Sequence, residues 1–63
     1  MSRRIEDMTD LELIQELAEV EAGLSPWMLD RIDEWLPRLE AGTMALSERQ
    51  REVAEQALRR VWE

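Results

Sequence analysis

The fold of this chain is decided by the stretch Leu24-Ser25-Pro26-Trp27-Met28 and by the apolar pattern that follows it to Gly42. Ser25 and Pro26 form a helix start, because serine caps exposed amides and proline at the first helical position loses no hydrogen bond. Gly42 supplies the stop, since glycine adopts a left-handed conformation at little cost. We therefore predict a helix over residues 26–41, the central helix of a small domain. Its apolar stripe at helical spacing comprises Met28, Leu29, Ile32, Trp35, Leu36 and Leu39.

Two residues of this segment lie outside the stripe. Trp27 falls off the apolar face and has no evident place in a core. Pro37 lies inside the helical pattern, where its ring removes a backbone hydrogen bond. Because Pro37 is opposite the stripe, we predict a kink there that bends the helix around the core.

An earlier helix begins at Thr9, where Thr9 and Glu12 have the spacing of a capping box. We predict this helix over residues 10–22, with Gly23 as its stop and residues 1–8 as a flexible lead. Its apolar face comprises Leu11, Leu13, Ile14, Leu17, Ala18, Val20 and Leu24, and Glu12, Glu16 and Glu19 lie on the opposite face.

A last helix begins after Ser47, with Gln50 completing a second capping box. We predict it over residues 48–62, with Trp62 at the margin of its apolar stripe and Glu55 paired with Arg59 one turn later. Three amphipathic helices joined by short connections predict an all-α, compact three-helix bundle, a single domain over residues 1–63. The pattern also allows a helical hairpin that reaches a second copy, and so short a chain would gain core from a dimer.

The composition excludes several classes of function. The 63 residues contain no cysteine and no histidine, which removes disulfides, thiolate nucleophiles and the commonest metal ligand and general base. The net charge of −7 opposes general binding to the phosphate backbone of nucleic acids. No apolar run reaches the roughly 18 residues of a membrane span. These features predict a cytoplasmic protein that does not associate with membranes.

The carboxylates are the only candidates for catalysis or metal binding, and we expect them to form a solvated face. The clusters Glu12/Glu16/Glu19 and Asp30/Asp33/Glu34 have helical spacing, but bundle metal sites need histidine partners that point inward. An acid–base pair would need a desolvated pocket that three short helices hardly enclose. We predict no enzyme activity, no cofactor and no metal.

The strongest functional signal is apolar. Trp27 lies off its apolar stripe and Trp62 lies at the edge of its own, which is typical of a protein-binding patch. The other interpretation is that these two side chains cover the two ends of the bundle. The acidic face of Glu12, Glu16 and Glu19 is a further candidate for protein binding, as a mimic of DNA. The other interpretation is that these residues only keep the chain soluble. An alternative is a nucleic-acid-binding protein of the helix-turn-helix type, or an accessory protein of DNA metabolism. It would use Arg49, Arg51, Arg59 and Arg60, although interleaved glutamates oppose this.

From Leu24 onward the chain resembles a segment that recurs in phage and prophage proteins. The resemblance is carried by Leu24-Ser25-Pro26-Trp27, by an apolar helix ending at Gly42, and by Leu46-Ser47-Glu48-Arg49-Gln50. Pro26 and the pair Met44-Ala45 depart from the pattern. The resemblance brings no catalytic residues. It implies a phage-encoded accessory or host-directed protein that acts by binding. We expect such a protein to act in the cytoplasm of a host bacterium, where binding could inhibit a host or defence protein.

Overall fold

Helices form almost all of the part of the chain that the structure describes. The structure is a computed structural model that describes residues 4–62, apart from the side chain of Glu21. It consists of a 3-10 turn η1 (Ile5–Asp7), helix α1 (Asp10–Glu19), a second 3-10 turn η2 (Glu21–Gly23), helix α2 (Pro26–Glu40) and helix α3 (Glu48–Trp62). Residues 4–62 contain no β-strand. The predicted all-α fold of three helices is confirmed.

The predicted N-terminal caps are present at all three helices. The N–H of Glu12 donates to Oγ1 of Thr9 at 3.1 Å, and the N–H of Thr9 donates back to Oε1 of Glu12 at 3.0 Å. Ser47 and Gln50 repeat this reciprocal pair at 2.9 and 3.2 Å. Ser25 caps α2 by accepting from an N–H of its first turn at 3.2 Å. Each cap satisfies amides that a helix start otherwise leaves without a partner.

The helix ends differ from expectation at α1. This helix ends at Glu19 rather than at residue 22, because Val20 leaves the helical region and the turn η2 follows. Gly42 has the predicted left-handed conformation, with φ of 73°, but Gly23 does not. The small size of Gly23 is needed for another reason: a Cβ there would lie 3.0 Å from Cγ2 of Val61. Gly23 therefore lets η2 approach α3 closely.

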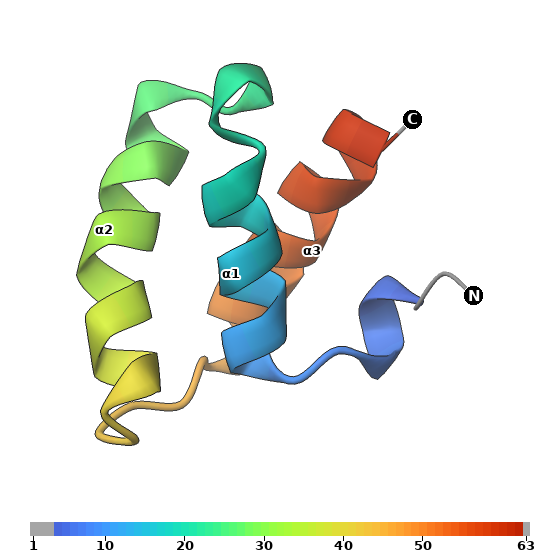
Figure 1. Ribbon diagram of the computed structural model, residues 1–63. Coiled ribbons are helices and arrows are strands. Elements are labelled where there is room, and N and C mark those ends of the chain that lie inside the picture. Colours follow the sequence, from blue (N-terminus) through green and yellow to red (C-terminus); the bar gives the residue numbers. More distant parts are fainter. Residues whose placement is uncertain (1–3, 63) are drawn as a thin grey trace.

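Helix α1, rather than α2, is the centre of the packing. Figure 1 shows α1 between α2 and α3, and it packs against both. Leu13, Ile14 and Leu17 of α1 are completely buried, together with Leu58 of α3. The radius of gyration is 10.8 Å, close to the value of about 10.6 Å expected for a globular chain of this length. Helix α2 is central in the sequence, but it covers one side of α1.

The segment before α1 belongs to the core. The expected flexible lead covered residues 1–8, of which residues 1–3 lie outside the described residues. Ile5 and Met8 are only 8% and 5% exposed, and η1 packs against α3. The expectation is therefore wrong for residues 5–8. Their apolar side chains cover an edge of the core that the three helices leave open.

The guanidinium group of Arg51 connects three separate segments. It donates to Oδ1 of Asp10 at 2.8 Å and to Oε2 of Glu55 at 2.7 Å. It also donates to the carbonyl oxygen of Met8 at 2.5 Å, which fixes the chain between η1 and α1. Asp10 accepts a further bond through Oδ2 from the N–H of Leu46 at 3.0 Å. The hydrogen bond to Asp10 raises the pKa of Arg51 above its ordinary value.

This network replaces one predicted ion pair. Glu55 was expected to pair with Arg59, but it binds Arg51, which lies on the preceding turn of α3. Arg59 lies 3.4 Å from a carboxylate oxygen of Glu6 instead. The pairing of Glu55 with Arg51 is favoured because the guanidinium group of Arg51 can bind the carboxylates of Asp10 and Glu55 at the same time. The kink at Pro37 remains a prediction, because α2 is one continuous helix through that residue.

We expect replacement of Arg51 by alanine to destabilise the fold by about 1.5–3 kcal/mol, because Asp10 and Glu55 would lose a charged hydrogen-bond donor in a partly buried site. Urea unfolding followed by circular dichroism measures this free energy. The matched control is Arg49→Ala, since Arg49 is exposed on the same helix. Its effect should stay within about 0.5 kcal/mol. Equal effects of the two substitutions would contradict a bridging role of Arg51.

The burial of Ile5 makes a second prediction. Ile5→Ala should cost about 2–3 kcal/mol, at the low end for a buried aliphatic side chain, because the site lies at the edge of the core. Arg4→Ala, at an exposed neighbouring position, is the control. Thermal unfolding of both variants measures the difference. If Ile5→Ala unfolded like the unchanged chain, the segment before α1 would not contribute to the core.

Candidate functional site

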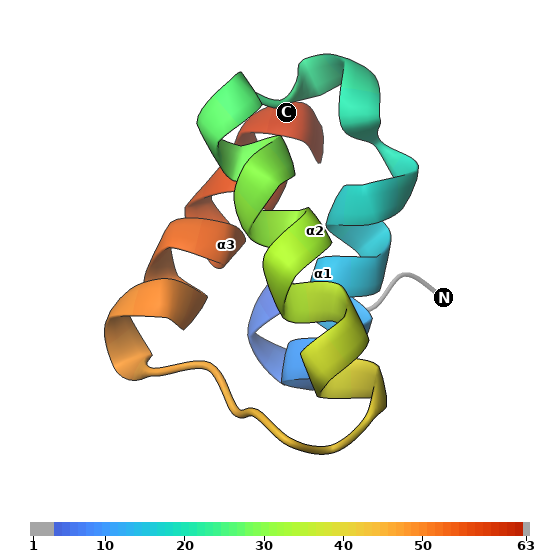
Figure 2. The same cartoon turned by 90° about the vertical axis from the view of Figure 1, so that its left-hand side faces the viewer.

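Two large apolar side chains are exposed in the part of the chain that the structure describes. Trp27 is 57% exposed and Trp62 is 46% exposed, whereas Trp35 is 5% exposed and belongs to the core. Trp27 lies at the start of α2 and Trp62 at the end of α3. Figures 1 and 2 show that these two helix ends lie at the same end of the molecule. The expectation that Trp27 lies outside the core is confirmed.

A shallow groove adjoins Trp27. It has a volume of about 250 Å³ and lies between η2, the first turn of α2 and the face of α3. We call it the Trp27 groove, and its lining residues are Gly23, Leu24, Ser25, Trp27, Met28, Val53, Gln56, Ala57 and Arg60. The apolar members form most of the lining, so Trp27 extends a hydrophobic surface rather than standing alone.

The edge of the Trp27 groove is positively charged, unlike the chain as a whole. Arg60 lies at this edge, and no acidic side chain pairs with it within residues 4–62. The first turn of α2 contains no acidic residue, whereas the first turns of α1 and α3 do. The positive end of the α2 dipole is therefore not neutralised locally. Arg31 lies with its guanidinium carbon 6.0 Å from the ring centre of Trp27 and pairs with Glu34 at 3.2 Å.

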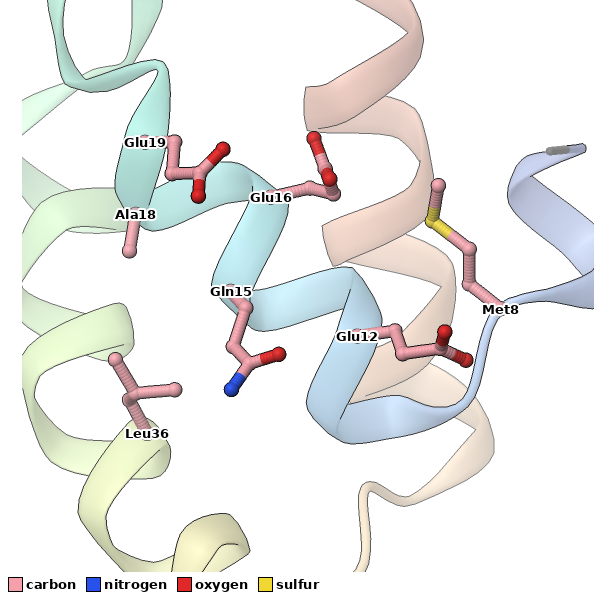
Figure 3. Close-up of a pocket in the computed structure, with 7 residues that line it drawn as sticks. All are labelled: Met8, Glu12, Gln15, Glu16, Ala18, Glu19 and Leu36. Carbon is pink, nitrogen blue, oxygen red and sulfur yellow. The ribbon is translucent and has the colours of Figure 1, made fainter. Parts of the chain in front are cut away.

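The acidic residues of α1 line a different hollow. Glu12, Glu16 and Glu19 surround a space of about 430 Å³ together with Met8, Gln15, Ala18 and Leu36. Figure 3 shows Gln15 and Ala18 on the side of Leu36, and Glu12 extending toward Met8. Glu12 and Glu16 are half-buried and Glu19 is exposed. Glu12 also closes the cap of α1, so part of this acidic set has a structural role.

The four arginines of the nucleic-acid alternative do not form one basic surface. Arg51 is bound to Asp10 and Glu55, and Arg59 lies beside Glu6. Arg49 and Arg60 are exposed, but they are eleven positions apart on α3. A phosphate backbone is bound by several cations together. The arrangement therefore offers two separate charges rather than a continuous patch.

Two serine hydroxyl groups and two carboxylates of the described residues are engaged in contacts within the fold. The hydroxyl groups of Ser25 and Ser47 accept hydrogen bonds from amides of their own helices. Residues 4–62 contain no group of three or more acidic side chains arranged to hold a metal ion. The carboxylates of Asp10 and Glu55 are bound to Arg51. These carboxylates therefore contribute to the fold.

Most of the groove could not be identified from the sequence. Leu24, Met28, Val53 and Ala57 were expected only as parts of apolar stripes. No local pattern marks these positions, because the groove is lined by residues of η2, α2 and α3 together. Arg60 was considered only for nucleic acids.

Comparisons with known proteins give no further guide. Protein-family models, curated proteins and solved structures all gave no match to this chain. Within residues 4–62, no helix combines the length and the apolar character needed to cross a bilayer. The surface itself therefore carries the functional argument.

The exposure of the tryptophans predicts different effects on stability. Trp35→Ala should cost about 3–5 kcal/mol, because it leaves a cavity in the core. Trp27→Ala and Trp62→Ala should each cost less than about 1 kcal/mol, as expected at surface positions. Urea unfolding monitored by circular dichroism compares the three variants. If Trp27→Ala lowered the free energy of unfolding as much as Trp35→Ala does, Trp27 would be a core residue.

Proposed function

We propose that this chain is a small acidic protein–protein interaction module that binds a partner protein through Trp27, Trp62 and the Trp27 groove. The observation that carries the proposal is the exposure of two tryptophans at the same end of the molecule, one of them beside an apolar groove. A tryptophan can bury some 150–250 Å² on contact. Tryptophan is also enriched among the residues that dominate binding energy at protein interfaces.

The proposed action is binding without catalysis. The remaining polar groups support this, because the serine hydroxyls cap helices and the carboxylates of Asp10 and Glu55 bind Arg51. The acidic face of Glu12, Glu16 and Glu19 would give the partner contact its charge selectivity, since like charges across an interface oppose wrong partners. In this proposal the acidic face is secondary to the tryptophans.

The resemblance to phage and prophage proteins adds a biological setting. In that setting the chain is encoded by a phage or prophage, and it inhibits a host or defence protein in the bacterial cytoplasm by occupying that protein's surface. This part of the proposal rests on the short sequence pattern alone. The binding surface does not depend on it.

Nucleic-acid binding is the weaker alternative. Arg51 and Arg59 face acidic side chains of the same chain, which leaves Arg49 and Arg60 without such partners in the described part of α3. The net charge of −7 opposes the approach of a polyanion. We therefore favour a protein partner.

The test is affinity capture from a lysate of the organism that encodes the chain, followed by reconstitution with the purified captured protein. The unchanged chain, Trp27→Ala, Trp62→Ala and the control Arg49→Ala are compared, with helicity checked by circular dichroism. We expect a partner whose affinity falls at least about tenfold for Trp27→Ala, as for an interface residue of high energy. The control should bind like the unchanged chain. Failure to find any partner that depends on either tryptophan would overturn the proposal.

A further inference from the structure

The Trp27 groove has the size of a site for one side chain rather than for a small molecule. Its volume of about 250 Å³ lies below the roughly 300–1,000 Å³ of typical small-molecule pockets. Its lining is mainly apolar and includes Leu24, Trp27, Met28, Val53 and Ala57. A groove of this kind is complementary to one large apolar side chain presented by a partner segment.

The charge at the edge of the groove indicates what should accompany that side chain. Arg60 has no acidic partner in the described residues, and the start of α2 adds the positive end of a helix dipole without an acidic residue in its first turn. Both features favour a carboxylate over a cation or a neutral group. Arg60 and the start of α2 also adjoin the apolar lining of the groove, whose burial by a partner would be favourable. The groove thus offers a hydrophobic site and, beside it, a positively charged site for an anion.

We propose that the Trp27 groove binds a helical segment of a partner protein in which one large apolar side chain enters the groove and an Asp or Glu one turn away meets Arg60. This inference rests on the proposed function and specifies the chemistry of the partner. The spacing follows from the helix, because residues four positions apart lie on one face about one turn, or 5.4 Å, apart.

The interaction differs from what the net charge suggests. A chain with a net charge of −7 attracts basic partners at long range. At short range, contacts depend on local charge, since interactions beyond roughly 8–10 Å are screened at physiological salt. An acidic segment would therefore bind with modest association rates and would gain its selectivity on contact. A second copy of this acidic chain is the competing occupant of the groove.

The probes are synthetic peptides of about 14 residues, long enough to be partly helical, built of Ala, Gln and Ser with one central Phe. Two pairs are made, with the variable residue four positions before or after Phe. Within each pair, Glu in one peptide replaces Gln in the other. Chemical shifts of the nitrogen-15-labelled full chain, titrated with each peptide, give the affinity and locate the site.

We expect one Glu peptide to bind about two- to fivefold more tightly than its Gln twin, the range for an exposed ion pair. The shifts should centre on Trp27, Val53 and Arg60. Arg60→Gln should remove the difference between the twins, and the matched control Arg49→Gln should retain it. Both arginines are exposed on α3, so neither substitution should alter the fold.

Each other outcome overturns this inference. If the Glu and Gln peptides of each pair bound equally at Trp27, the proposed contact between a carboxylate and Arg60 would be rejected. The proposed binding surface would remain. Shifts centred on Glu16 and Glu19 would move the site to the acidic hollow. Shifts that depend on protein concentration without peptide would show that a second copy occupies the groove. No binding by any peptide would reject the groove as a helix site, whereas the proposed function fails only if no partner depends on the tryptophans.

Discussion

The contact between Arg51 and Asp10 is the interaction on which the arrangement of the other elements depends. Asp10 is the first residue of α1, and Arg51 lies in the first turn of α3, so their 2.8 Å ion pair fixes the two helix starts together. The same guanidinium holds the backbone of Met8, and the same carboxylate holds the backbone of Leu46. One charged pair thus determines where the segment before α1 and the connection before α3 enter the bundle. Apolar packing alone would set these positions less specifically.

The core that this contact helps to enclose is small. Among residues 4–62 only five side chains are completely buried, and three of them belong to α1. Helices of 10 or 15 residues are marginal in water without tertiary packing. The capped starts, η1 and the Arg51 network therefore supplement a core that would otherwise be limited. Against this need for burial, the exposure of Trp27 and Trp62 stands out, because both could have added apolar surface to the core.

Local features of the fold were predictable from the sequence, and tertiary ones were not. The three caps and the bounds of α2 and α3 follow from hydroxyl groups, proline and helical periodicity, which act within a few residues. Ile5 and Met8 gave no signal, because two apolar residues beside acidic ones define no periodic element. The choice of Arg51 as the central cation depends on contacts with residues 41 or more positions away. Trp27 was recognised by its angle on the helix, but the groove beside it exists only once α2 and α3 are both in place.

The close contact of η1 with α3 also has a consequence for the order of folding during synthesis. Residues 5–10 are the first described part of the chain to leave the ribosome, yet their partner Arg51 is made more than 40 residues later. The buried face of α1 is completed by Ala54 and Leu58 of α3. Residues 4–47 therefore cannot close this core by themselves. Closure of the core therefore has to wait until α3 has been made.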